Sequence, residues 1–199
     1  MPSAAASPAR ALPLQLEVCV TDYRKAVADA RQLFQNMADE VLSERPAPRS
    51  WSAIECIVHL NLCNQAMLPG LRQAVESAPP VAEDANRDYR MDLLGRFLAW
   101  SLEPPPQIKM KTSVSAEPLD VKSPRDVLKE FDLQHQLFLG LLKMSAGRAI
   151  DRQKMKSPFA NIHYNAYSAF RIIAAHDRRH LWQARHALPP QVQVVRLSE

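Results

Sequence analysis

The sequence contains little glycine and little cysteine. Four Gly stand against 16 Pro in 199 residues, which is too few for a Rossmann unit, and neither a Gly-rich phosphate loop nor a Gly-x-Ser-x-Gly turn occurs. Three Cys, an odd number, argue against a disulfide framework. No segment reaches the roughly 18 consecutive apolar residues of a membrane span. Scarce Gly beside abundant Pro favours helices joined by rigid linkers.

The charge and the apolar content are those of an ordinary globular domain. The net charge is +4, with 47% apolar and 23% charged residues, which suits a soluble protein as well as it suits a nucleic-acid partner. The Ala/Pro/Ser-rich residues 1–13 lack the apolar core of a signal peptide. We therefore expect a flexible tail over 1–13, one cytoplasmic domain over 14–190 and a C-terminal tail over 191–199, without membrane or nucleic acid as partner.

Four long helices are predicted, over residues 14–43, 52–78, 123–143 and 161–188. The first has an apolar seam at alternating spacings of four and three residues, as bundle helices do. The third begins with Ser123 as N-cap and Pro124 at the first helical position. The last ends before Pro189 and Pro190.

The second helix has the clearest start. Ser52 and Glu55 form the spacing of a capping box, and Trp51 and Cys56 have that of a hydrophobic staple. Pro69, followed by Gly, is expected to kink or interrupt this helix.

A long connection separates the second helix from the third. Residues 80–122 offer one short helix near 89–100, with Leu93, Phe97 and Trp100 on one face, and some polar/apolar alternation over 108–118. Short links join antiparallel neighbours, whereas a long link permits a parallel crossover. The predicted fold is all-α, an up-down-down-up four-helix bundle with a long crossover between helices 2 and 3. Such a connection normally crosses the end of a bundle or covers a site.

Two histidines four residues apart, His176 and His180, share one face of the last helix. They are close enough to hold one divalent cation between them. The spacing alone is weak evidence, because two polar residues on a partly exposed helix would look the same. A metal site also needs a ligand from another element, and His59 in the second helix is the best candidate. The alternative for His59 is a core histidine whose ring is satisfied by a backbone carbonyl.

Two segments resemble a known family. Residues 48–60 contain Trp-Ser-x-x-Glu-x-x-x-His-Leu, which resembles a segment of the DinB/YfiT-like superfamily, and His-Asp-Arg-Arg-His-Leu-Trp-Gln over 176–183 looks like that family's last-helix motif. The resemblance covers roughly residues 14–188. It implies a four-helix bundle.

The resemblance also implies a metal site. Many members bind nickel or zinc through one His of helix 2 and a His-x-x-x-His pair of helix 4, and these positions fall on His59, His176 and His180. Some relatives are thiol-dependent S-transferases or isomerases that use low-molecular-weight thiols, and others are hydrolases. We therefore expect a metal-dependent transferase or hydrolase acting on a small molecule, with a low-molecular-weight thiol as a further cofactor candidate and a homodimer left open. The alternative is a non-catalytic binding or stress-response module.

Further residues are weaker candidates. Glu55 lies one turn before His59 and could act as a general base, although its capping role already explains it. Cys56, His59 and Cys63 form a rival ligand set, but three ligands on consecutive turns of one straight helix diverge along its axis. Buried packing is favoured for both cysteines, and either could still lie near the metal.

Several residues of the last two helices have a functional and a structural interpretation. Asn165 and Gln183 share the His176 face and could orient a ligand, whereas Asp177 points away from it. His-Asp-Arg-Arg-His lacks the catalytic Glu of zinc proteases, which disfavours peptidase activity. His135 lies in an apolar seam and could line the cavity, but core packing is the favoured interpretation. A stripe of Arg171, Arg178 and Arg185 could track phosphates, but a solvated helix face is the favoured interpretation.

Overall fold

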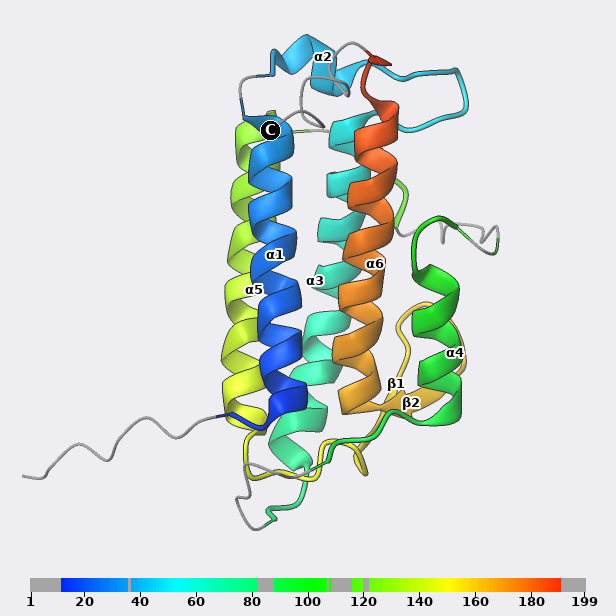
Figure 1. Cartoon of the computed structure of the whole chain (residues 1–199). Helices are drawn as coiled ribbons and strands as arrows, with labels where there is room; N and C mark the ends of the chain where they lie inside the picture. Colours follow the sequence, from blue (N-terminus) through cyan, green and yellow to red (C-terminus); the bar gives the residue numbers. More distant parts are fainter. Residues whose placement is uncertain are drawn as a thin grey trace, which may run out of the picture.

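The computed structural model describes residues 12–35, 37–81, 88–106, 108, 116–119 and 122–190. The helices and strands, shown in Figure 1, are α1 (Leu14–Phe34), α2 (Asp39–Ser43), α3 (Ala53–Ser77), α4 (Leu93–Leu102), α5 (Pro124–Ser145), β1 (Lys154–Lys156), β2 (His163–Asn165) and α6 (Ala166–Ala187). Except for Leu12 and Pro13, the two predicted tails lie outside the described residues. None of the described helices is long and apolar enough to cross a membrane.

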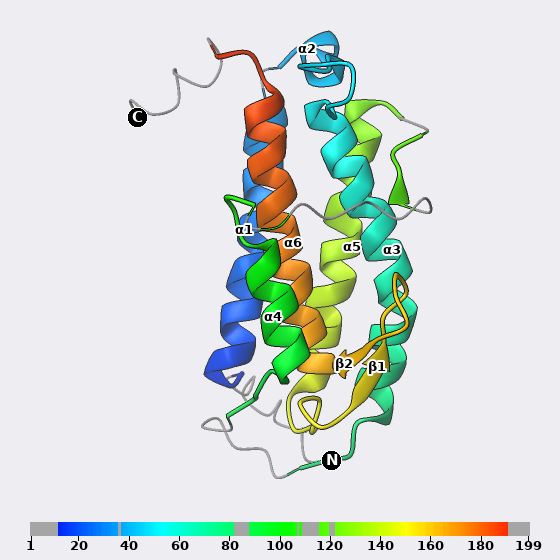
Figure 2. The same cartoon turned by 90° about the vertical axis from the view of Figure 1, so that its right-hand side faces the viewer.

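The four long helices α1, α3, α5 and α6 lie side by side along one axis (Figures 1 and 2). Both α1 and α3 pack against α5 and α6, so α1 lies diagonally across the bundle from α3. In Figure 1 the colours of α1 and α6 progress from the lower end to the upper end, and those of α3 and α5 progress the other way. The predicted helical class is confirmed, with one small antiparallel hairpin in addition.

The first helix ends earlier than predicted. Gln35 has extended backbone angles after α1, and the chain resumes helix only at Asp39. The short α2 lies across the upper end of the bundle (Figure 1), where Leu42 is buried and Met37 and Val41 pack on the core. Met37 and Val41, which continue the apolar spacing of the predicted first helix, thus cover the end of the core instead of extending its side.

The predicted interruption at Pro69 does not occur, because α3 runs without a break from Ala53 to Ser77. Beside it, a Cβ on Gly70 would lie 3.4 Å from the Met155 side chain of β1. The hairpin therefore packs directly on this part of α3.

The last helix begins at Ala166, five residues later than predicted, because Asn165 ends β2 and caps α6. The Asn165 side chain accepts from the amide of Ser168 (2.7 Å) and donates to the carbonyls of Arg90 (2.9 Å) and Asp151 (2.7 Å). The polar atoms of the Asn165 side chain are thus engaged at the start of α6. A role in orienting a ligand stays a prediction.

The core consists of two apolar clusters with a polar layer between them. One cluster includes Phe138 and Phe170 in the lower half of the bundle, and the other includes Ile57 and Phe131 in the upper half. The buried polar side chains at the intermediate helix positions are His59, Asn61, Asn64, Gln134, His135, Asp177 and His180. Such a layer is costly to bury unless it is hydrogen-bonded or binds a ligand.

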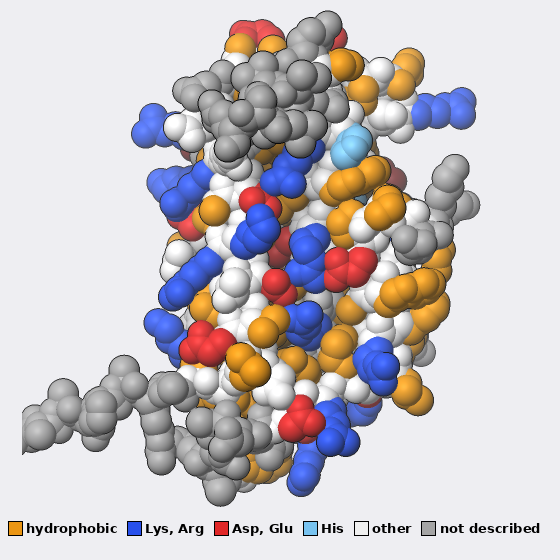
Figure 3. Space-filling view, viewed as in Figure 1, with side chains coloured by type: hydrophobic (Ala, Val, Ile, Leu, Met, Phe, Trp, Pro, Cys, Tyr) orange, Lys and Arg blue, Asp and Glu red, His pale blue; other side chains and the backbone are white. Residues whose placement is uncertain are grey.

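The short α4 packs on the outside of α6. Leu93, Phe97 and Trp100 share a face, as expected, and all three are exposed. Hydrophobic side chains gather on this side of the molecule, at the right of Figure 3.

Candidate metal centre

The start of α3 fixes the position of His59. The Ser52 hydroxyl accepts from the Glu55 amide (3.3 Å), and the Glu55 carboxylate accepts from the Ser52 amide (2.8 Å), which is the predicted capping box. His59 follows one turn after Glu55, within the helix and on its buried side. The ring of Trp51, predicted as half of a staple, lies over the rings of His59 and His180, with centroids 4.8 and 5.9 Å away.

The three predicted histidines come together between α3 and α6. Ring centroids are 5.1 Å apart for His59 and His176, 4.4 Å for His59 and His180, and 4.5 Å for His176 and His180. The Nε2 atoms of His59 and His176 lie 3.3 Å from each other. His59 and His180 are buried, with exposed fractions of 5% and 7%, whereas His176 is partly exposed.

The tightest group of ligand atoms differs from the predicted triad. Among the residues that the structure describes, potential ligand atoms of His59, Cys63 and His176 all lie within 4.8 Å of one another. The Cys63 sulfur is 3.6 Å from Nε2 of His59. His180 is outside this group, so a ligand set made of three histidines stays a prediction. Cys56, the other cysteine of the rival set, is fully buried in the upper apolar cluster.

One ring nitrogen of His59 is held by the chain itself. Its Nδ1 lies 2.7 Å from the carbonyl oxygen of Ala116, and since a carbonyl only accepts, Nδ1 carries the proton in this contact. The alternative of a core histidine satisfied by a backbone carbonyl therefore holds for Nδ1 of His59. The other nitrogen, Nε2, keeps its lone pair and faces His176, which is the arrangement of metal-binding histidines.

The connection between α3 and α5 reaches the site at further points. Arg179 donates to the carbonyls of Ser101 (3.1 Å) and Ile108 (3.0 Å). Together with the Ala116 contact, these bonds tie described parts of the connection to the two helices that carry the histidines. This agrees with a connection that covers a site, although residues 82–87, 107, 109–115, 120 and 121 lie outside the described part of the chain.

Burial keeps the three imidazoles neutral. It lowers the pKa of His59, an effect that the Ala116 carbonyl partly offsets. Burial, helped by the positive charges of a protonated His59 and of Arg179, lowers the pKa of His176 to about 3. The pKa of His180 is lowered well below its usual value for the same reasons. Neutral imidazoles are the form that binds metals.

The cysteine of the group is protonated when no metal is bound. Burial, with a smaller contribution from the negative charge of Asp177, raises the pKa of Cys63 to about 12. Coordination deprotonates a thiol outright, so such a sulfur becomes a ligand only by losing its proton to the metal.

Glu55 is engaged elsewhere. Arg45 donates to both of its carboxylate oxygens, with Nε at 3.0 and 2.8 Å. Burial raises the pKa of Glu55, but the hydrogen bonds from Arg45 and Ser52 outweigh this and lower it. A carboxylate with a lowered pKa is a weaker base, and a role as general base remains a prediction.

His135 and Asp177 form a second buried polar pair, between α5 and α6. Nε2 of His135 lies 2.9 Å from the Asp177 carboxylate, and Nδ1 lies 2.9 Å from the Phe131 carbonyl. His135 is in the core, as expected, and Asp177 points away from the three histidines, as expected. The pair is structural, since neither residue is exposed.

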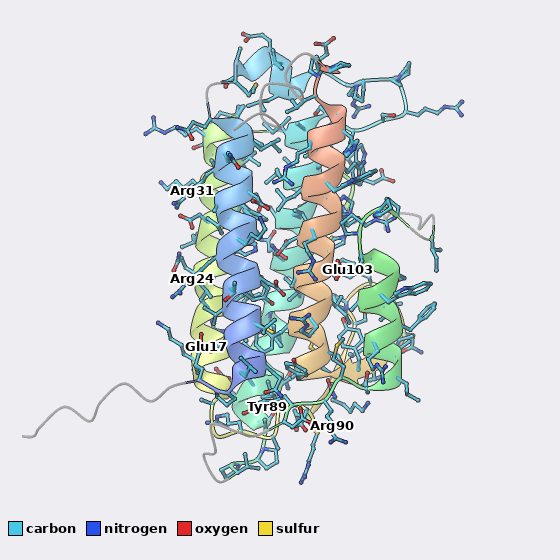
Figure 4. All side chains as sticks on the ribbon, viewed as in Figure 1. Glu17, Arg24, Arg31, Tyr89, Arg90 and Glu103 are labelled. Atoms are coloured by element: carbon cyan, nitrogen blue, oxygen red, sulfur yellow. The ribbon has the colours of Figure 1, made fainter. Side chains whose placement is uncertain are left out.

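The arginine stripe of α6 is neutralised within the protein. Arg171 pairs with Asp22 (3.0 Å), and Arg178 donates to Glu103, with atoms 2.6 and 2.9 Å apart. Glu103 lies beside α6 in Figure 4. Arg185 completes the stripe by pairing with Asp29 of α1 (3.2 Å). Acidic and basic side chains are mixed over this face in Figure 3, so the stripe does not present a purely basic surface.

Two features of the site carried no usable sequence signal, since the Ala116 carbonyl is a main-chain atom and the ring of Trp51 matched a staple. The spacing of four residues between His59 and Cys63 did carry a signal, which placed both in the rival ligand set, although core packing was favoured for the cysteine.

These elements define a helical bundle with a histidine cluster between α3 and α6, and the comparisons with known proteins agree with the bundle fold. The sequence pattern of the DinB superfamily matches residues 22–184. The chain therefore belongs to the DinB superfamily.

Among solved structures, the chain is similar to YfiT from Bacillus subtilis, described as a probable metal-dependent hydrolase with an unusual four-helix bundle topology. The similarity has a TM-score of 0.58 at 15% identity and covers 94% of this chain and 90% of YfiT. At this identity the likeness shows the fold. A comparison with curated proteins gives no match.

Proposed function

We propose that this protein is a metal-dependent enzyme that acts on a small molecule, either as a hydrolase or as a thiol-dependent transferase. His59, His176 and His180 would hold a zinc or nickel ion. The observation that carries the proposal is the convergence of three imidazole rings from α3 and α6, with centroids between 4.4 and 5.1 Å apart. The up-down-down-up order of the long helices is part of the proposal, and the helix directions in Figure 1 support it.

The residues present fit such an ion. All three imidazoles are kept neutral by their surroundings, and Nδ1 of His180 is buried with no hydrogen-bond partner in the described part of the chain. A polar atom left unpaired in the core is costly unless a ligand satisfies it.

The ion would supply Lewis-acid activation of a water or a thiol near neutral pH. The chain contributes the orientation and the surroundings. The Ala116 carbonyl holds the His59 ring so that Nε2 faces the cluster, and Trp51 covers two of the three rings. His176 is the most exposed of the three, so a substrate would approach from its side.

Two facts outside the cluster support the enzyme class. The chain belongs to the DinB superfamily, and YfiT, which shares the fold, is described as a probable metal-dependent hydrolase. A thiol-dependent transferase rests on the family resemblance alone.

A non-catalytic binding or stress-response module is the second candidate. The burial of His59 and His180, at 5% and 7% exposed, favours it, because a deeply buried ion has few directions open to substrate.

Metal analysis of the untagged protein is the first test. We expect one zinc or nickel per chain in the wild type, and loss of both the metal and any turnover in His180→Ala. His163→Ala is the matched control, since His163 is exposed on β2 outside the cluster. A wild-type protein that retains no zinc or nickel after purification and reconstitution would contradict the proposal. So would a His180→Ala protein that loses turnover with its metal fully retained.

A further inference from the structure

We propose that Cys63 is a metal ligand of this centre, completing a set of four with His59, His176 and His180. The inference rests on the proposed metal site and extends it, because three histidines alone leave a position open for water or substrate. With Cys63 bound, the resting site is closed by protein ligands.

The helix spacings place two chelating pairs opposite each other. His59 and Cys63 are four residues apart on α3, and His176 and His180 are four residues apart on α6. Side chains at this spacing lie one above the other on the same helix face. Since α3 and α6 pack directly against each other, the two pairs face one another, and potential ligand atoms of His59, Cys63 and His176 lie within 4.8 Å of one another. This removes the objection to three ligands on one straight helix, because each helix needs to supply only two.

Two distances from Nε2 of His59 match those between ligands of a tetrahedral ion. With zinc–nitrogen bonds of about 2.05 Å and zinc–sulfur bonds of about 2.3 Å, two nitrogens are separated by about 3.3 Å and a nitrogen and a sulfur by about 3.6 Å. In the structure, Nε2 of His59 lies 3.3 Å from Nε2 of His176 and 3.6 Å from the Cys63 sulfur. Both distances are those expected if His59, His176 and Cys63 bind the same ion.

His180 is a second, independent sign of a ligand at this point. It is only 7% exposed, and among the residues that the structure describes its Nδ1 has no hydrogen-bond partner. Its ring lies against both other histidine rings. The proposed ion would satisfy an atom that the described residues leave unpaired.

The bond-forming step is simple. The Cys63 sulfur forms a bond to the divalent ion, and the thiol proton is released to solvent, so the net charge of the occupied site is +1 instead of +2. A thiolate ligand favours a soft or borderline tetrahedral ion, which points to zinc over nickel. Substrate must then either expand the coordination to five or displace Cys63, so this residue controls access to the ion.

Cobalt(II) is the probe that tests the assignment without depending on activity. The metal-free protein is titrated with Co²⁺, and the near-ultraviolet sulfur-to-cobalt charge-transfer band is followed together with bound cobalt. We expect one cobalt per chain and a clear band in the wild type. Cys63→Ser should still bind one cobalt at saturation, because three imidazoles remain, but without the band and with at least about tenfold lower affinity.

Cys56→Ser is the matched control. Cys56 lies on the same helix one turn before His59, but it is buried in the upper apolar cluster, so this variant should keep the band. Circular dichroism checks the fold of each variant, and Cys63→Ala replaces Cys63→Ser if the serine is not tolerated. A wild type that binds one cobalt without the band, or a Cys63 variant that keeps it, would overturn the role of Cys63 and leave the histidine site standing. Failure of the wild type to bind any cobalt or zinc would overturn both.

Discussion

His176 and Asp177 are neighbours on α6, but they belong to two different polar groups of the bundle. His176 faces α3 and joins His59 and His180 in a cluster whose tightest group of ligand atoms contains no carboxylate. Asp177 faces α5 and pairs with His135 at 2.9 Å. Successive residues of a helix point about 100° apart, so one short stretch of α6 supplies both groups.

The two groups show that burial alone does not decide the charge of a histidine. His135 is the most buried of the four, and burial is the largest single influence and lowers its pKa, but the charge and hydrogen bond of Asp177, the Phe131 carbonyl and the charge of Asp132 together raise it. His176 has no such partner, and its pKa falls to about 3. A neighbouring carboxylate favours the charged form of His135, whereas the group of ligand atoms at His59 and His176 contains no carboxylate among the described residues and suits a cation.

Removing Asp177 should have the largest effect on stability. Asp177→Ala leaves His135 buried without its partner, which we expect to lower the free energy of unfolding by about 3–5 kcal/mol. Urea unfolding measures the loss. The double variant Asp177→Leu/His135→Leu should recover most of it, since a buried pair can be replaced by apolar residues of similar volume. A loss below about 1 kcal/mol in Asp177→Ala would show that the pair contributes little.

Removing His176 should act on metal binding instead. His176→Gln takes away an imidazole that faces Nε2 of His59, and zinc affinity should fall at least about 100-fold in a competition titration. His163→Gln, an exposed histidine on β2, should leave the affinity unchanged. The unfolding free energy of metal-free His176→Gln should stay within about 1 kcal/mol of the wild type. Unchanged zinc affinity in His176→Gln would contradict the assignment of His176 to a metal-binding group.

The histidine cluster and the His135–Asp177 pair should change the pH dependence of stability in opposite directions. Because the folded pKa of His176 is about 3 and the unfolded value is about 6.5, the metal-free protein should lose stability as pH falls from about 6.5 toward 3, by at most about 1.4 kcal/mol per pH unit for each such histidine. His59 and His180 act in the same direction. His135 acts in the opposite one, since its stabilisation is complete below its unfolded pKa and is lost as pH rises through its raised folded pKa.

Urea unfolding of the metal-free protein between pH 8 and 4 measures this dependence. His176→Gln should flatten the acid side of the profile, whereas Asp177→Asn should alter the side near and above neutrality. An acid side that is equally steep in the wild type and in His176→Gln would contradict the lowered pKa.

Glu55→Gln should have the smallest effect, and it tests whether this nearby carboxylate acts on the cluster. The Glu55 oxygens already accept from Arg45 and Ser52, so the variant should cost about 1 kcal/mol of stability. Zinc affinity and any turnover should stay as in the wild type. Loss of turnover with the metal retained would instead identify Glu55 as a base.

Local signals in the sequence were sufficient for the starts of α3 and α5, but not for that of α6. The Ser52 capping box and the Ser123 cap form with the predicted residues. The two family motifs also predicted that His59 and His176, 117 residues apart in the chain, would meet. These features depend on side-chain types at fixed short spacings, which a sequence displays directly.

Features that depend on tertiary packing could not be predicted in this way. The apolar seam continues through Met37 and Val41, so nothing in the sequence marks the end of α1 at Phe34. Strands of three residues are too short for an alternating pattern to be recognised. Cys63 looked like core because its second partner, His176, comes from another helix.

The hydrogen bond between His59 and residue 116 has a consequence for how this region tolerates change. Its acceptor is a main-chain carbonyl, which no substitution at position 116 can delete. The orientation of the His59 ring thus depends on the path and length of the connection and hardly on its composition. Replacing residues in this segment should be far less harmful than inserting or deleting a single one, a tolerance that makes the connection a place where sequence can diverge while the histidine cluster is preserved.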